Sequence, residues 1–350
     1  MEKRQVLNGH LSRYGGGFGR LAVASLTVIL QSMFCAPAAQ AQHFGEWGPA
    51  VSVDPLRLAG INTTNNDGCP IEAPDGLTLF FATNRDGNLD IWTASRDSKE
   101  ADWKDASRLP APVNTPANDF CPTPLPGKGL LFVSTRGNTC AGTGNNADIY
   151  YTRRDSRGAW AEPQPLSCAV NSGGQEFSPS LVQAEGQTML FFSSDQDDLS
   201  GHKQKIFVSV LQPDGTWQQA KPVAELNWPG ASDARPNIRK DGLEIVFDST
   251  RWSTTPQIYT ATRSSVDDEW SEPTPLSGNV NFAGQAQSRP TISRDGTRLY
   301  FGSTLANATL GGTQSDIYVS RRSARGQDKR EQSEREERME KQGSGRDDER

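Results

Sequence analysis

Four carboxylates and one amide recur at the same place in the chain, three residues before a proline: Asp67, Asp119, Glu176, Asp233 and Gln287. Two carboxylates of different character can hydrolyse a glycosidic bond. If the protein is an enzyme, its candidate catalytic residues are therefore Glu176, Asp233, Asp119 and Asp67. The same acids could instead accept backbone N–H groups in their own turns, or form an acidic funnel for a cation or a basic peptide. Because catalysis needs acids in unlike environments and these acids recur, we expect the turn role.

The residue directly before each of these prolines breaks the repetition, since the series is Cys69, Cys121, Ser178, Arg235 and Arg289. Side chains that differ between otherwise equivalent positions can recognise one particular ligand. We expect a ligand-binding face made of Arg85, Arg136, Arg235, Arg251, Trp252, Gln287 and Arg289. Arginines beside acids can bind a carboxylate, a sugar acid or a phosphate. The alternative is ordinary ion pairing at the rim, worth about 0–1 kcal/mol for each pair.

Four of the five cysteines, Cys69, Cys121, Cys140 and Cys168, lie beyond the N-terminal segment. An even number in an exported chain indicates disulfides, and four cysteines allow three connectivities. We favour Cys69 with Cys121 and Cys140 with Cys168. A zinc site is the alternative, although the paired C-x-x-C spacing of such sites is missing.

Two further features could bind a ligand. The acidic run with Asp195, Asp197 and Asp198 resembles a weak calcium site, because calcium prefers six to eight oxygen ligands. Asp-rich segments also form ordinary tight turns. Trp228 and Trp252 are additional to the repeat described below, and either local packing or stacking on a sugar ring would explain Trp252. Apart from calcium, no cofactor motif is present: the sequence has neither a phosphate loop nor a dinucleotide fingerprint.

The elements that must position these residues come from an internal repeat. A tryptophan recurs every 53 to 57 residues, at Trp47, Trp103, Trp160, Trp217 and Trp270. Each repeat then has an apolar residue followed by asparagine, the proline described above, a glycine-containing turn, and two strand-like segments such as "TRLYFGS" and "SDIYVSRR". About four short strands per repeat, separated by Gly, Asp or Pro turns, predict an all-β, five-bladed β-propeller with four-stranded antiparallel blades.

The register also predicts how the ring closes. The chain begins with an outer-type strand, "EWGPAVSV", and the fifth repeat lacks that strand. The N-terminal strand should therefore complete the last blade and cover two exposed edges. The expected propeller covers residues 42–322, with repeats at about 48–103, 104–160, 161–217, 218–270 and 271–322.

The segments "PTISRDGTRLYFGS", "PNIRKDGLEIVFDSTR" and "APDGLTLFFATNRDGNLDIWTASR" resemble the Pro-Asp type of WD40-like β-propeller repeat. This family includes TolB-like periplasmic propellers. The resemblance covers all five repeats, although "PLPGKG" and "LVQAEG" depart from the usual Pro-Asp-Gly turn. It implies the propeller fold and a binding role in the cell envelope, but propellers support many functions.

The two ends have other compositions. Residues 1–41 have arginines, an apolar stretch from Leu21 to Phe34, and Ala39-Gln40-Ala41, which together predict a cleaved secretory signal. Residues 323–350 carry charges of both signs and almost no apolar residues, so we expect a disordered tail. These features predict a periplasmic or secreted protein, with no membrane insertion after signal cleavage.

The formal net charge of −6 argues against a nucleic-acid partner. With three histidines in the chain, a site of several histidine ligands is also excluded. Our main hypothesis is a monomeric, non-catalytic binding module that docks an envelope protein, peptide or glycan through one loop face. The alternative is a carbohydrate-active hydrolase or polysaccharide lyase. A third hypothesis is a scaffold whose charged tail recruits a partner.

Overall fold

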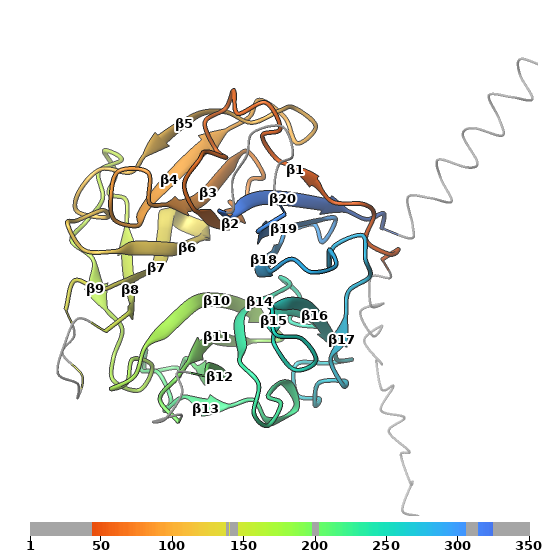
Figure 1. Ribbon diagram of the computed structural model, residues 1–350. Helices are drawn as coiled ribbons and strands as arrows, with labels where there is room; N and C mark the ends of the chain where they lie inside the picture. Colours follow the sequence, from red (N-terminus) through yellow and green to blue (C-terminus); the bar gives the residue numbers. More distant parts are fainter. Residues whose placement is uncertain (1–43, 138–139, 141–145, 198–202, 306–313, 325–350) are drawn as a thin grey trace, which may run out of the picture. The chain divides into compact units, whose positions relative to one another are not determined.

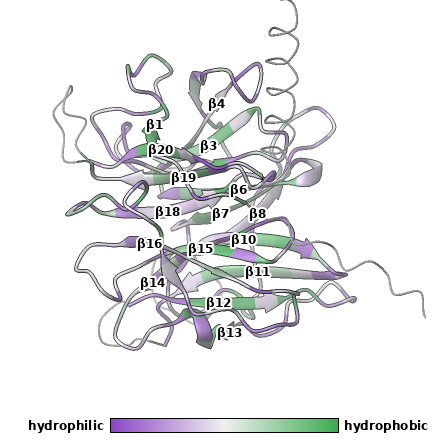
Figure 2. Ribbon diagram, turned by 90° about the vertical axis from the view of Figure 1, so that its right-hand side faces the viewer, coloured by the Kyte–Doolittle hydropathy of each residue, from purple (hydrophilic) through white to green (hydrophobic). Residues whose placement is uncertain are grey.

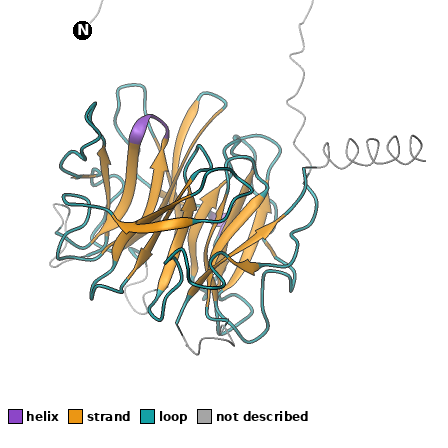
Figure 3. Ribbon diagram, turned by 90° about the horizontal axis from the view of Figure 1, so that it is seen from above, coloured by secondary structure: helices purple, strands orange, loops and turns teal. Residues whose placement is uncertain are grey.

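The computed structural model describes residues 44–137, 140, 146–197, 203–305 and 314–324. The expected signal and nearly all of the expected tail lie outside these residues. Within them the chain forms five antiparallel sheets of four strands, as predicted. The two short 3-10 helices are η1 (Pro126–Lys128) and η2 (Ala224–Leu226), so strands and loops dominate the view in Figure 3. No helix in these ranges is long and apolar enough to cross a membrane.

Each sheet is one blade, and its strands follow one another outward. Blade 1 contains β2 (Asp67–Glu72), β3 (Thr78–Thr83), β4 (Asp90–Ser95) and β5 (Lys104–Arg108). Blade 2 contains β6 (Asp119–Leu125), β7 (Gly129–Ser134), β8 (Asp148–Arg153) and β9 (Gln164–Pro165). Blade 3 contains β10 (Glu176–Ala184), β11 (Gln187–Ser194), β12 (Lys205–Val210) and β13 (Lys221–Pro222).

Blade 4 contains β14 (Asp233–Ile238), β15 (Glu244–Ser249), β16 (Gln257–Thr262) and β17 (Thr274–Pro275). Blade 5 contains β18 (Gln287–Ile292), β19 (Arg298–Ser303) and β20 (Asp316–Arg321), and its fourth strand is β1 (Val51–Ser52). Because Val51 pairs with Val319 and Ser52 with Tyr318, the N-terminal strand closes the last blade. This confirms the predicted closure.

The first strands of the blades surround a common axis (Figure 1). Each of β2, β6, β10, β14 and β18 contacts the first strand of both neighbouring blades, and β18 contacts β2. The second strands carry the most continuous apolar sequence; β7, β15 and β19 are buried along their whole length. Figure 2 shows the apolar residues concentrated along the strands and polar residues in the loops. The large apolar clusters lie between adjacent blades, as in the cluster of Phe191 from blade 3 with Phe247 from blade 4.

The asparagine of each repeat joins two blades. Its side-chain amide accepts the backbone N–H of an isoleucine in the third strand of the preceding blade and donates to the carbonyl of the same residue, at 2.7–3.1 Å. The five pairs are Asn62–Ile317, Asn114–Ile91, Asn171–Ile149, Asn227–Ile206 and Asn281–Ile258. The amide therefore acts like a short strand segment and satisfies backbone groups at the blade boundary.

We predict that Asn114→Ala destabilises the protein strongly. The change leaves the buried N–H of Ile91 without its partner and removes the bonds that the amide donates to the carbonyls of Ile91 and Leu109. An unsatisfied buried group costs about 1–3 kcal/mol. Urea unfolding should therefore show a loss of about 2 kcal/mol or more in the free energy of unfolding. Asn65→Ala is the control, because no hydrogen bond of its side chain is found within the described ranges. Equal stability of the two variants would contradict the proposed role of the asparagines.

Candidate functional site

Every first strand bulges at the residue before its proline. The pairing register with the second strand shifts at this point in all five blades. The bulged residues have left-handed φ values of 46° to 56°, and they are Cys69, Cys121, Ser178, Arg235 and Arg289. A β-bulge re-aims a side chain, and here all five residues line one cavity at the centre of the ring. The non-repeating series found in the sequence therefore forms the wall of the channel.

This axial cavity is narrow. Its volume is about 20 Å³, which is enough for about one water molecule. Prolines and short polar side chains such as Thr123 and Thr291 also line it. A ligand larger than water must therefore bind at the mouth of the channel.

Both predicted disulfides are present. Cys69 and Cys121 connect blades 1 and 2 across the channel wall, with a Cα–Cα distance of 4.8 Å. Cys140 and Cys168 are bonded at a Cα–Cα distance of 5.4 Å. Since all four cysteines are paired with one another, the zinc alternative is wrong. In the described ranges no group of three or more His, Cys, Asp or Glu residues is arranged to hold a metal ion.

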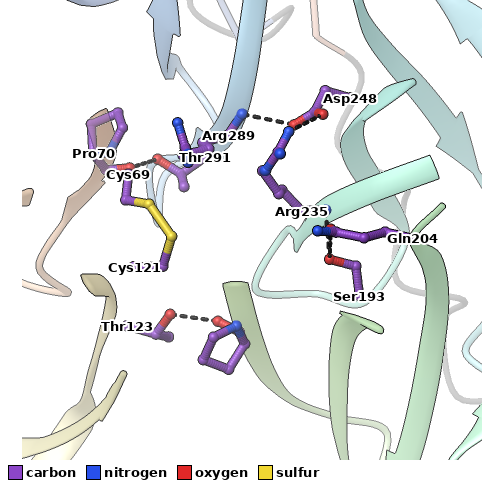
Figure 4. The surroundings of a disulfide bond; sticks show 11 residues. Cys69, Pro70, Cys121, Thr123, Ser193, Gln204, Arg235, Asp248, Arg289 and Thr291 are labelled. Atoms are coloured by element: carbon purple, nitrogen blue, oxygen red, sulfur yellow. Dashed lines mark hydrogen bonds and ion pairs between the residues drawn. A yellow bond between two sulfur atoms is a disulfide. The ribbon is translucent and has the colours of Figure 1, made fainter. Parts of the chain in front are cut away.

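Two arginines, Arg235 and Arg289, line the channel wall opposite this disulfide, and Asp248 on β15 lies beside them (Figure 4). Arg235 donates to Asp248 at 2.6 Å, and the backbone N–H of Arg289 donates to the second oxygen of the same carboxylate at 2.8 Å. The Arg289 guanidinium makes no hydrogen bond or ion pair with any residue that the structure describes, and its Nε is buried without a partner. Burial and the charge of Arg235 lower the pKa of Arg289 to about 10, so it remains cationic at neutral pH.

A larger cavity begins beside Arg289. It has a volume of about 300 Å³ and lies against blades 5, 1 and 2. Asp67, Asn66, Asn84 and Ser315 line it together with apolar side chains and Cys69. The Ser315 hydroxyl is buried without a hydrogen-bond partner in the described part of the chain. This volume is at the lower end of the range for small-molecule sites.

The repeated acids hold their own turns, as expected. Each carboxylate is completely shielded from solvent and accepts a backbone N–H from four or five residues earlier, for example Asp67 from Thr63 at 2.6 Å and Glu176 from Ser172 at 3.1 Å. The same contact occurs at Asp119 and Asp233. In blade 5, Gln287 instead bonds to Gln257 and Ser303. These contacts leave the four candidate catalytic acids engaged within the scaffold.

Three of the rim arginines are partners of these acids. The ion pairs are Arg85–Asp67 at 3.0 Å, Arg136–Asp119 at 2.6 Å and Arg251–Asp233 at 2.6 Å. Each guanidinium also lies over aromatic rings of its own blade, which adds cation–π attraction. The structure thus separates Arg85, Arg136 and Arg251, which are held inside their blades, from Arg235 and Arg289 in the channel wall.

The remaining predicted residues lie on the loops. Trp252 is 58% exposed and packs edge-on against Trp228, with ring centroids 5.8 Å apart. Asp195 accepts hydrogen bonds from the backbone and side chain of Gln175. Asp197 lies in the adjoining turn, whereas Asp198 lies outside the described residues.

Asp148 is a site residue that the sequence reasoning missed. The first residues of the third strands are Asp90, Asp148, Lys205, Gln257 and Asp316. All of them except Asp148 have a side-chain partner: the pairs are Asp90–Arg108, Lys205–Asp233, Gln257–Gln287 and Asp316–Arg57. Both carboxylate oxygens of Asp148 are buried without a partner in the described part of the chain. Burial, with the nearby charge of Glu176, raises the pKa of Asp148 to about 7, and burial also raises the pKa of Glu176. Aligning the repeats does not single it out, because Asp90 and Asp316 occupy the same position; the difference is that these two have arginine partners.

Neither a protein-family model nor a curated protein matches this sequence. Among solved structures, the α-L-arabinofuranosidase of Lactobacillus brevis is 13% identical, with 75% of this chain and 92% of that chain covered and a TM-score of 0.52. The catalytic domain of the GH62 α-L-arabinofuranosidase of Coprinopsis cinerea is 15% identical, with coverages of 80% and 98% and a TM-score of 0.51. At such identities the likeness shows a shared fold alone.

TolB of Acinetobacter baumannii is also similar, at 14% identity with coverages of 79% and 55%, but its TM-score of 0.40 is too low to support an argument. The resemblance to the Pro-Asp repeat family therefore stays a prediction beyond the propeller fold.

The Asp148 carboxyl predicts a pH-dependent stability. Its pKa is about 7 in the folded protein and about 3.9 when unfolded, so between these values the folded state binds more protons and stability falls as pH rises. Asp148→Asn removes this loss. Between pH 5 and 7 the free energy of unfolding of the variant should rise relative to that of the native protein by up to about 1.4 kcal/mol per pH unit. The difference should level off above pH 8. Urea titrations at several pH values measure the difference.

The control for this experiment is Asp102→Asn, because Asp102 is exposed; its stability should stay parallel to that of the native protein. A pH dependence in Asp148→Asn equal to that of the native protein would show that Asp148 is ionised at neutral pH in the folded state.

Proposed function

We propose that the protein is an exported binding module that takes its ligand at the mouth of the channel. The observation that carries this proposal is the cavity of about 300 Å³ beside Arg289, where Arg289 Nε and Ser315 Oγ are buried without partners in the described part of the chain. Buried polar groups are normally hydrogen-bonded, so these two favour a ligand that supplies the missing bonds. The repeated acids, in contrast, are already satisfied.

Export is supported indirectly. Two disulfides within a single chain favour an oxidising compartment, and residues 1–41 have the pattern of a secretory signal. The partners available there are envelope proteins, peptides and glycans. The module would act as a monomer with no cofactor.

Hydrolysis of a glycosidic bond is the second candidate function. Asp148 is buried near Glu176, and burial together with the charge of Glu176 raises the pKa of Asp148 to about 7. A carboxylic acid with such a pKa can act as a general acid, with Glu176 as the second carboxyl group. Glycoside hydrolases recur among the solved structures of similar fold. The assay is release of nitrophenol from nitrophenyl arabinofuranosides by the native protein and by Glu176→Gln. Activity in the native protein that falls by at least about 100-fold in the variant would support hydrolysis; activity that survives unchanged would reject Glu176.

We predict that a bulky residue at the cavity edge abolishes ligand binding. A thermal-shift screen of the oxidised protein covers uronic-acid and neutral oligosaccharides, short peptides and calcium. A ligand at about 100 times its dissociation constant stabilises the protein by about 2.7 kcal/mol, which raises the melting temperature by several degrees. Asn66→Trp should remove this shift, because Asn66 lines the cavity.

Asn65→Trp is the matched control, since Asn65 is the adjacent residue and does not line the cavity; it should keep the shift. If Asn66→Trp responded to the ligand as the native protein does, the ligand would bind elsewhere and the proposed site would be wrong.

A further inference from the structure

The channel wall carries one positive charge more than it can neutralise. Arg235 and Arg289 share a single buried carboxylate, Asp248. Asp248 uses one oxygen for the Arg235 guanidinium and the other for the backbone N–H of Arg289, so the Arg289 guanidinium receives no anion. Taking a charge out of water is costly unless it is paired. The arrangement therefore favours a bound group with one negative charge.

The carboxylate of Asp67 cannot serve this purpose. Asp67 also lines the cavity, but its two oxygens already accept bonds from Thr63 and Arg85. The Asp67–Arg85 pair is neutral as a unit and leaves the charge of Arg289 uncompensated. Arg289 also has space around it, because the neighbouring residue of blade 1 is Gly68. A Cβ atom at Gly68 would lie 3.5 Å from Arg289 Nη1, so any larger side chain would compete for the space beside the guanidinium.

The rest of the cavity wall combines two chemistries. Asn66, Asn84 and Ser315 offer neutral donors and acceptors, while Ala82, Leu89 and Phe120 are apolar. Hydroxyl groups match the polar side, and the C–H face of a sugar ring matches an apolar or aromatic surface. A volume of about 300 Å³ suits a ligand of about one sugar ring. A peptide carboxylate would pair with the Arg289 guanidinium but would leave the amides of Asn66 and Asn84 and the hydroxyl of Ser315 without ligand hydroxyl groups to bind.

We propose that Arg289 binds the carboxylate of a sugar acid, with the sugar ring seated in the adjoining cavity. This inference rests on the proposed function and names its ligand class. The guanidinium can meet the carboxylate with two parallel hydrogen bonds, and the monoanion balances Arg235, Arg289 and Asp248. A doubly charged phosphate would leave one negative charge in excess.

The test is calorimetric titration of the oxidised full-length protein at pH 7 with D-galacturonate, with its neutral counterpart D-galactose, and with N-acetylalanine as a non-sugar carboxylate. Galacturonate should bind at least about tenfold more tightly than galactose, because a hydrogen bond to a charged group contributes about 1.5–3 kcal/mol. It should also bind more tightly than N-acetylalanine, which has the carboxylate but lacks the sugar ring that occupies the cavity. Arg289→Gln should weaken galacturonate binding by at least about tenfold, and Arg289→Lys should fall between.

Arg153→Gln is the matched control, because Arg153 is an exposed arginine on β8, and it should bind like the native protein. Arg289→Gln removes an unpaired charge, so its melting temperature should be no lower than that of the native protein; this confirms folding. Galacturonate binding unchanged in Arg289→Gln would overturn the inference. Equal affinity for N-acetylalanine would overturn the sugar assignment.

These outcomes separate the inference from the proposed function. If galacturonate fails to bind but another ligand gives a thermal shift that Asn66→Trp removes, the sugar-acid assignment is wrong and the binding role stands. If no ligand class gives such a shift, the binding role itself is wrong.

Discussion

The whole ring depends on one backbone constraint, the left-handed residue that precedes the proline in each first strand. Non-glycine residues adopt this conformation at a cost of about 1–2 kcal/mol, yet all five blades have it. The bulge directs one side chain per blade toward the axis, and the residues that follow it bond between blades: Thr291 donates to the carbonyl of Pro70, and Ile292 N–H donates to Asn237. Blades 1 and 2 are joined at the bulge itself, by the Cys69–Cys121 disulfide.

The division between scaffold and site follows from this geometry. Residues repeated in the blades satisfy the backbone: the asparagines bridge neighbouring blades, and the acids hold turns and pair with arginines. Residues that differ between blades at the bulge face the same small opening. The channel therefore has a covalent bond on one side and two arginines on the other, and its charge is unbalanced because Asp248 has only two oxygens to share between them.

The sequence carried enough information for the fold and for part of the site. The tryptophan, asparagine and proline periods predicted five four-stranded blades and the closing strand, because these patterns are local and repeated. The preferred cysteine pairing, with Cys69 and Cys121 on neighbouring blades, is also the one found. The distinction between Arg85 and Arg289 was not predictable, because the sequence does not show which arginine side chain meets a carboxylate; the contacts show that Arg85 is paired with Asp67. Asp148 was missed because the sequence does not show that its carboxylate lacks a hydrogen-bond partner in the described part of the chain, or that it lies near Glu176 of the next blade.

The central claim is that the unpaired Arg289 guanidinium is a binding group. A crystal structure of the oxidised protein grown with D-galacturonate tests it most directly. We predict electron density for the sugar acid in the cavity beside Gly68, with its carboxylate within hydrogen-bond distance of Arg289 and with Arg235 still on Asp248. An Arg289 guanidinium bonded to a carboxylate of the protein itself, with the cavity free of galacturonate, would contradict the account.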